Sequence, residues 1–182
     1  MAAIGVFCAS SQRLGKQWLD LAHEVGVEIG RRGHTLVSGG GIVGMMGALA
    51  DGARAGGART IGVIPQSLVA LEVADHNSDE LIVTGSMAER KTIIIDKSDG
   101  FITLPGGLGT LDELFEVWTT ASLQVHRKPV VLLDVDGFYA GLVGWLHGLV
   151  PTNFARAEAL SLLSVATDVR AAFDLVEESW TR

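Results

Sequence analysis

The amino-acid sequence predicts an α/β protein built on one doubly wound parallel sheet, with helices on both faces. Short apolar runs that are typical of buried strands alternate with longer segments of helical periodicity. The strand runs are almost continuously apolar, as in residues 3–9, and this pattern indicates strands that are covered on both faces. Glycine is abundant, with 23 residues, while proline is rare, with 4, which favours tight turns between regular elements. Together these features predict a Rossmann-like fold.

Turn and stop signals bound the predicted elements. The first helix ends at Gly33, the third strand ends at Pro65, and a capping-box pattern from Ser86 to Glu89 begins the fourth helix. Segment 66–80 is polar and irregular. In chain order, the expected strands are residues 3–9, 34–37, 60–64, 81–84, 101–104 and 129–134. The expected helices are residues 16–32, 43–55, 87–97, 111–124 and 138–149, with a terminal helix after residue 167.

Length, charge and cysteine content narrow the class of protein. The 182 residues, 48% of them hydrophobic, suffice for one core, so we expect residues 1–182 to form a single α/β domain. The net charge of −7 argues against a nucleic-acid partner but leaves room for a small anion in a local positive field. The lone Cys8 excludes an intrachain disulfide framework. With no membrane-length apolar run and no basic residue ahead of the apolar N-terminus, we expect a cytoplasmic protein without a membrane partner.

A first glycine loop, SGGGIVGMMG, follows the second predicted strand. It matches G-x-G-x-x-G, but the next strand ends at Ile64 and Pro65 without the acid that a dinucleotide site requires, and there is no Walker lysine. We therefore expect a loop whose backbone approaches a ligand other than NAD or an ATP phosphate. Close packing of a helix on a strand is the alternative interpretation. The expected ligand contacts are Ser38, Gly39, Gly40 and Gly41.

A second loop, LPGGLGTLDE, follows the fifth predicted strand and leads into a helix. Its glycines and the helix N-terminus favour an anion, yet the helix opens with two acids. Thr110 to Glu113 fits a capping box, which is a purely structural explanation for Glu113. Arg90 and Lys91, one turn into the preceding helix, supply positive charge for an anion, unless they form a solvated helix face.

Three segments in this order, SGGGIVGMMG, MAERK and PGGLGTLDE, resemble the LONELY GUY family of cytokinin-activating enzymes. The family pattern PGGxGTxxE is complete from Pro105 to Glu113, and the resemblance runs from the first strand to about Asp136. It implies a phosphoribohydrolase that cleaves the N-glycosidic bond of N6-modified AMP, giving the free base and ribose 5-phosphate. The same pattern often carries the label "lysine decarboxylase", but the sequence has no recognisable site for a pyridoxal cofactor.

The resemblance also implies residue roles, a homodimer with the site near the subunit contact, and no cofactor. Arg90 and Glu113 correspond to the catalytic pair. The implied substrate contacts are Glu72, Lys91, Gly106, Gly107, Leu108, Gly109, Thr110 and Thr119. A carboxylate such as Glu113 can stabilise the positive charge that develops on the sugar, or activate water. Glu116 and Glu72 are candidates for a second carboxylate, and Arg90 stays protonated, so it can hold the substrate or the departing base.

Parts of the sequence are also compatible with two other functions, those of a carrier protein and of an oxidoreductase. Molybdenum-cofactor carrier proteins look similar in fold and glycine loops, so a non-catalytic nucleotide or cofactor carrier is the main alternative. A dinucleotide oxidoreductase is weakened by the missing acid. The five histidines show no metal-binding spacing, so no metal site is expected. Cys8 is expected to be a buried strand residue, and Ser10 and Ser11 to lie at a ligand pocket.

Overall fold

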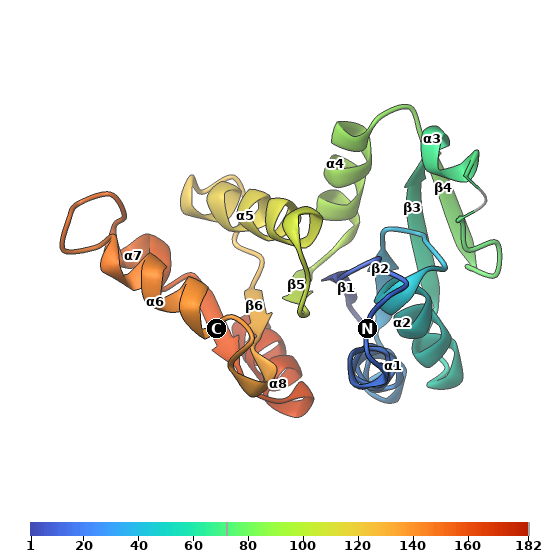
Figure 1. The fold of residues 1–182 in the computed structure, drawn as a ribbon, viewed down its shortest axis with the longest axis horizontal. Coiled ribbons are helices and arrows are strands. Elements are labelled where there is room, and N and C mark those ends of the chain that lie inside the picture. Colours follow the sequence, from blue (N-terminus) through green and yellow to red (C-terminus); the bar gives the residue numbers. More distant parts are fainter. Residues whose placement is uncertain (72, 182) are drawn as a thin grey trace.

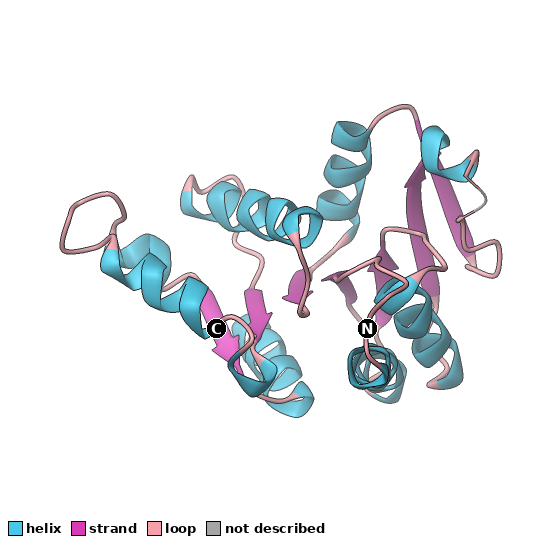
Figure 2. Ribbon diagram, in the orientation of Figure 1, coloured by secondary structure: helices cyan, strands magenta, loops and turns pink. Residues whose placement is uncertain are grey.

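The computed structural model describes residues 1–71 and 73–181, which form a parallel sheet of seven strands with helices on both faces (Figures 1 and 2). The strand order is β4-β3-β2-β1-β5-β6-β7, and every pair is parallel. The strands are β1 (Ala3–Phe7), β2 (Thr35–Ser38), β3 (Thr60–Pro65), β4 (Glu80–Thr84), β5 (Gly100–Thr103), β6 (Val130–Leu133) and β7 (Leu163–Ala166). The predicted doubly wound α/β class is confirmed.

The sheet grows outward in two directions from its centre. Strands β2, β3 and β4 follow one another on one side of β1, whereas β5, β6 and β7 follow on the other side. Phe7 at the end of β1 pairs with Thr103 at the end of β5, so the two carboxyl ends finish level. In doubly wound folds such a switch point opens a crevice for a ligand.

Two apolar layers hold the helices to the sheet. On one face, residues such as Ile4 and Ile102 pack against α1 (Lys16–Arg31), α2 (Gly44–Ala55) and α8 (Val169–Trp180). On the other face, residues such as Phe7 and Phe101 pack against α4 (Met87–Lys97), α5 (Leu108–Ser122) and α6 (Ala140–Gly148). In Figure 1, α4 and α5 lie on the opposite side of the strands from α1, α2 and α8. Adjacent strand residues point to opposite layers, as the alternation of side chains along a strand requires.

The predicted elements are present, with shifts of a few residues at their ends, and three short helices and one strand were missed. The polar segment after β3 contains the short helix α3 (Gln66–Val69), and a 3₁₀ turn (Val135–Gly137) precedes α6. The chain after α6 forms α7 (Ala157–Leu160) and the edge strand β7, neither of which was predicted. The single turn of α7 is too short to show helical periodicity, whereas β7 is a half-exposed edge strand whose apolar residues are interrupted by Ser164. None of the helices in the described part of the chain combines the length and the hydrophobicity that a bilayer-spanning helix needs.

The backbones of helices α1 and α2 are in close contact at Gly26. A Cβ atom on Gly26 of α1 would overlap backbone atoms of Leu49 and Ala53 in α2. The two helix backbones therefore come closer together than any side chain larger than hydrogen allows.

We predict that Gly26→Ala lowers the free energy of unfolding by about 1–3 kcal/mol, because backbone atoms must move to admit the methyl group. Gly144→Ala is the matched control, since Gly144 lies in exposed helix α6 with open space around its Cβ position. That variant should be neutral or more stable by up to about 1 kcal/mol. Thermal melting of both variants measures the difference, and equal Tm changes would contradict the close contact of α1 with α2.

Candidate active site

A cavity of about 410 Å³ lies at the switch point of the sheet. It is bounded by the segment after β1, by the first turn of α5, and by side chains from α2, α3 and α4. Its lining residues are Cys8, Ala9, Ser10, Ser11, Met46, Leu68, Met87, Arg90, Gly107, Leu108, Gly109, Thr110, Asp112 and Glu113. Ser10 and Ser11 line the cavity as expected, and Cys8 is buried as expected but follows β1, which ends at Phe7. Burial raises the pKa of the Cys8 thiol well above its ordinary value.

Arg90 is buried at the inner end of this cavity, with only 7% of its surface exposed. Its Nε donates to the carbonyl oxygen of Val63 (3.0 Å), and its Nη2 donates to that of Gly39 (3.3 Å). The remaining nitrogen, Nη1, lies 3.8 Å from Oε1 of Glu113. A buried guanidinium requires hydrogen bonds and opposite charge to offset its lost hydration, and these three groups supply both.

Glu113 faces Arg90 across the cavity, and its side chain is 13% exposed. Burial raises the pKa of its carboxyl to about 7, with a further rise from the charge of Asp112, while Arg90 and Lys91 act in the opposite direction. A carboxyl with a pKa near 7 is present in both protonation states at neutral pH. Perturbed carboxyls of this kind in a cavity are characteristic of acid–base sites.

The first turn of α5 forms one wall of the cavity. The helix begins at Leu108 with Gly107 at the N-cap, and no side chain caps it. The predicted capping box at Thr110 is therefore wrong, since Thr110 already lies within the helix, where it is buried. No described residue accepts a hydrogen bond from the backbone N–H of Leu108, Gly109 or Thr110, so these donors are open to an anion.

At Ser86, by contrast, the predicted cap is confirmed. The Ser86 hydroxyl accepts a hydrogen bond from the Glu89 N–H (3.1 Å), and α4 begins at the next residue, Met87. The Glu89 carboxylate accepts from the N–H of Gly85 (2.7 Å), one residue earlier than the usual capping box. This cap fixes the start of α4, one turn before Arg90.

Lys91 and Glu116 lie outside the cavity. The Lys91 Nζ is 3.0 Å from Asp112 Oδ2 and 2.6 Å from Glu116 Oε2, and these two acids raise the pKa of its ammonium group. The side chain thus joins α4 to the outer face of α5. The structure does not bring Lys91 into the cavity, and it directs the Glu116 carboxylate to Lys91.

The first glycine loop contacts the Arg90 guanidinium and lies outside the cavity. Residues 38–41 are buried and do not line the cavity. The Gly40 carbonyl accepts from the Asp75 N–H (2.8 Å), and Gly41 forms an isolated bridge with Ala74. A Cβ on Gly39 would overlap the Arg90 guanidinium. The loop thus seats the arginine and anchors the segment before β4.

The remaining expected contacts have different positions. A Cβ on Gly106 would overlap the Thr110 side chain, which packs against it. Thr119 is exposed on α5 and does not line the cavity. Glu72 lies outside the described residues.

The sequence did not reveal the apolar part of the lining. Met46, Leu68 and Met87 come from α2, α3 and α4, which meet only in the folded chain. The available signal was spacing, because Met87 precedes Arg90 by three residues and so shares its helix face. The Met87 sulfur lies 3.8 Å from Arg90 Nη1.

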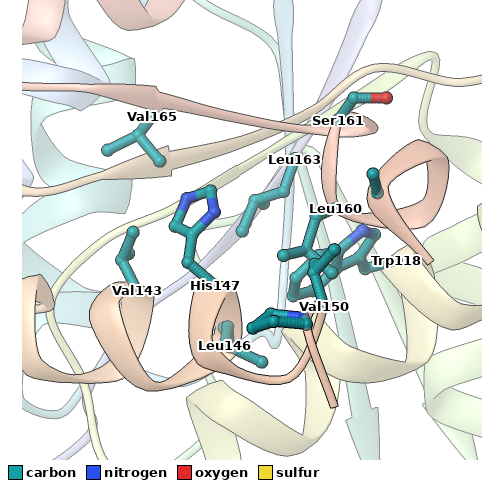
Figure 3. Close-up of a pocket in the computed structure, with 11 residues that line it drawn as sticks. Trp118, Val143, Leu146, His147, Val150, Leu160, Ser161, Leu163 and Val165 are labelled. Carbon is teal, nitrogen blue, oxygen red and sulfur yellow. The ribbon is translucent and has the colours of Figure 1, made fainter. Parts of the chain in front are cut away.

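A second, apolar cavity of about 500 Å³ opens between α6, α7 and β7 (Figure 3). Trp118 forms part of its wall, together with Val143, Leu146 and Leu163, and the His147 ring points toward it. No carboxylate or guanidinium lines it, so it lacks the groups that hydrolysis requires. Among the described residues, no group of three or more His, Cys, Asp or Glu side chains could hold a metal ion.

The fold and the switch-point cavity define a class of Rossmann-like proteins with a helix N-terminus beside an arginine–carboxylate pair. A family model described as "Possible lysine decarboxylase" matches residues 46–176. A cytokinin riboside 5′-monophosphate phosphoribohydrolase from Mycobacterium tuberculosis is 52% identical over 169 residues, which cover 93% of this chain and 90% of that protein. The protein of the same name from Mycobacterium marinum is 47% identical over 91% of this chain and 88% of its own length. The chain therefore belongs to the LONELY GUY family, as the sequence resemblance predicted.

Solved structures share the fold at lower identity. The molybdenum cofactor carrier protein from Chlamydomonas reinhardtii superposes with a TM-score of 0.75 and is 28% identical, over 100% of this chain and 99% of that one. The carrier proteins thus share the architecture, while the relatives with the higher sequence identity carry the name of a hydrolase.

The raised pKa of Glu113 has a consequence for stability. Between the ordinary carboxyl pKa of 4.5 and the folded value of about 7, the folded protein retains a proton that the unfolded chain has lost. The free energy of unfolding therefore falls as the pH rises through this window and levels off above about pH 7. A pKa rise of this size corresponds to about 3 kcal/mol.

We predict that Glu113→Gln is more stable than the original protein at pH 8, and that this advantage shrinks toward pH 5, where Glu113 is protonated. Thermal melting of both proteins at pH 5 and pH 8 measures the effect. Glu24→Gln, which removes a carboxylate from the exposed side of α1, controls for the loss of one negative charge. A Tm difference that does not change with pH would contradict the assignment of a buried, ionisable carboxyl.

Proposed function

We propose that this protein is a phosphoribohydrolase that cleaves the N-glycosidic bond of nucleoside 5′-monophosphates. Its substrates are N6-modified AMP and, in addition, AMP itself; the products are the free base and ribose 5-phosphate. Residues 1–182 form a single nucleotide-binding domain in this proposal, with no metal, cofactor, membrane or nucleic-acid partner. The names of the relatives that are 52% and 47% identical support this activity.

The observation that carries the proposal is the pairing of Arg90 with Glu113 inside one cavity, at 3.8 Å between Nη1 and Oε1. The complete PGGxGTxxE pattern supplies one partner, and the helix before it supplies the other. Cleavage at ribose C1′ passes through a centre with positive charge on the sugar, which a nearby carboxylate stabilises. Arg90 and Glu113 are accordingly the proposed catalytic residues.

The 5′-phosphate binds at the N-terminus of α5 in this proposal, on the open N–H groups of Leu108, Gly109 and Thr110. Glu113 begins the next turn, about 6 Å further along the helix axis than Gly109. This offset suits a ribose 5-phosphate, whose C1′ lies on the far side of the sugar from the phosphate. One helix turn thus serves both ends of the sugar phosphate.

The chemical step exchanges one bond for another. The C1′–N bond breaks, its electron pair leaves with the base, and a water oxygen forms the new bond to C1′. The ionised Glu113 accepts the proton that the water loses, and this proton then passes to the departing base, which restores the ionised carboxylate. Arg90 remains protonated and stabilises negative charge on the base as the bond breaks.

The other proposed substrate contacts lie outside the cavity lining. Lys91, Thr119 and Gly106 are proposed on the family resemblance alone, as is Glu72, and residues 38–41 on the glycine loop at the carboxyl end of β2. Lys91 would first have to leave its two acidic partners, Asp112 and Glu116.

A homodimer in the cytoplasm is also proposed. Leu108 and Met87, at 89% and 47% exposed, leave apolar surface uncovered beside the cavity, and a second subunit would bury it. The free, buried thiol of Cys8 supports a reducing compartment.

We predict that the purified protein releases free base from isopentenyl-AMP, and that Glu113→Gln lowers the rate by about 10²-fold or more while it still binds AMP. Base release is measured by chromatography, and binding by calorimetry. Glu116→Gln is the matched control, because that carboxylate lies one turn further along α5 and outside the cavity. Nucleotide binding without base release from either AMP or isopentenyl-AMP would favour a carrier protein instead.

We predict that kcat/KM rises with pH through about 7, because the ionised form of Glu113 is the active one. The charge of Asp112 raises the pKa of Glu113, so Asp112→Asn should move this rise to lower pH. The free substrate phosphate also titrates, at about pH 6, but its contribution cannot respond to that substitution. A rate that falls with pH through this range would assign Glu113 the role of a proton donor.

A further inference from the structure

Although the protein is acidic, one of its cavities is lined by three cations and a single acid. Most of its described lysines and arginines form ion pairs with acids. Among the described residues, the cations that form none are Arg13, Arg127, Lys128 and Arg156. Three of these four line a single cavity of about 590 Å³, remote from the switch point.

This cavity, here called the basic cavity, lies near the amino-terminal ends of β6 and β7, whereas the candidate active site lies at the carboxyl ends of the central strands. Its walls come from the end of α5, the segment leading into β6, α7, β7 and the end of α8. It shares none of its lining residues with the cavity that contains Glu113. A ligand bound here would therefore not compete directly for the candidate active site.

Two guanidinium groups are free to bind in the basic cavity. Lys128 donates from Nζ to the carbonyl oxygen of Ile95 (2.6 Å), so its ammonium caps the C-terminal end of α4. Arg127 and Arg156 are exposed, and neither side chain has a hydrogen-bond partner among the described residues. An arginine without a partner in a cavity retains all five N–H donors for a ligand.

The surrounding groups favour a doubly charged anion. The Nδ1 of His126 accepts a hydrogen bond from the Lys128 N–H (3.2 Å), and burial lowers the pKa of this ring, so it adds no charge at neutral pH. Glu158 is the single acid in the lining, which leaves a net charge of about +2. The hydroxyls of Ser161, Ser164 and Ser179 add neutral donors.

We propose that the basic cavity binds a small phosphate monoester through Arg127 and Arg156. A phosphate monoester carries about −1.5 to −2 charges at pH 7, which matches the excess of cations, whereas a simple carboxylate carries only one. Arginine binds phosphate oxygens with two parallel N–H donors, and the volume lies within the range of small-molecule sites. The site is independent of the proposed hydrolase activity.

The test is an NMR titration of the ¹⁵N-labelled protein with inorganic phosphate, ribose 5-phosphate and AMP, each at constant ionic strength. Amides of Ser161, Ser164 and Ser179 report the basic cavity, while those of Leu108 and Gly109 report the candidate active site. We expect saturable shifts of the first set, and a loss of affinity of about tenfold or more in the double variant Arg127→Gln/Arg156→Gln. The matched control, Arg170→Gln, removes an exposed arginine of α8 that lies outside the cavity and should leave the titration unchanged.

The three probes distinguish the sources of the phosphate group. Tighter binding of ribose 5-phosphate than of inorganic phosphate assigns a sugar phosphate, tighter binding of AMP assigns a nucleotide, and equal binding assigns the phosphate group alone. Three results would overturn the proposal. They are the absence of saturation with every probe, equal shifts in the double variant, and saturation only by a polyanion such as poly-glutamate, which would indicate an acidic protein partner. Failure of base release in the hydrolysis assay would leave this result untouched, since the two sites are read from different amides.

Discussion

The buried guanidinium of Arg90 is the group on which the arrangement of the candidate active site depends. It contacts three separate parts of the chain, namely the end of β3 through Val63, the loop after β2 through Gly39, and α5 through Glu113. A cation this deep in a protein must be compensated by fixed dipoles and opposite charge. The carbonyl groups of Val63 and Gly39 bind two of the guanidinium nitrogens and so fix the position of Arg90. The third nitrogen, Nη1, is thereby directed toward Glu113. The Ser86 cap and the pairing of Lys91 with α5 hold the helix that carries it.

This arrangement explains why the chain has two glycine-rich loops of different use. Gly39 approaches Arg90 so closely that a Cβ would overlap the guanidinium, whereas the Cβ positions of Gly107 and Gly109 face open space beside the first turn of α5. In the first loop glycine makes room for a side chain of the protein itself. In the second loop, glycine leaves the cavity open beside the N-terminus of α5. The two loops share a composition, but the first is part of the buried structure and the second lines the cavity.

Arg90 and Glu113 were named from the family resemblance, and both line the switch-point cavity. The sequence itself predicted the order of the elements and the edge of the sheet where this cavity lies. It could do so because strand burial, helix periodicity and the capping of α4 are local properties. The start of α5 was misjudged for a physical reason, since Thr110 fits a cap pattern but its side chain packs against Gly106 inside the first turn. The positions of Met46 and Leu68, and the gathering of Arg127 with Arg156, depend on the packing of distant elements. No local pattern encodes such packing, and neither the single turn of α7 nor the half-exposed edge strand β7 carries a clear apolar pattern.

The proposed phosphate site and the acids beside it are compatible once the protonation of Glu113 is considered. With a pKa of about 7, the carboxyl is partly protonated at neutral pH, so a phosphate at the proposed site would meet less than a full negative charge. Such a phosphate would raise the pKa of Glu113 further, whereas Arg90 acts in the opposite direction and favours the ionised form. As the sugar becomes positive, the ionised form is favoured in turn, because the carboxylate now faces opposite charge. In the proposed reaction, the carboxylate therefore interacts most strongly with the state in which the glycosidic bond breaks, and this is the differential binding that catalysis requires.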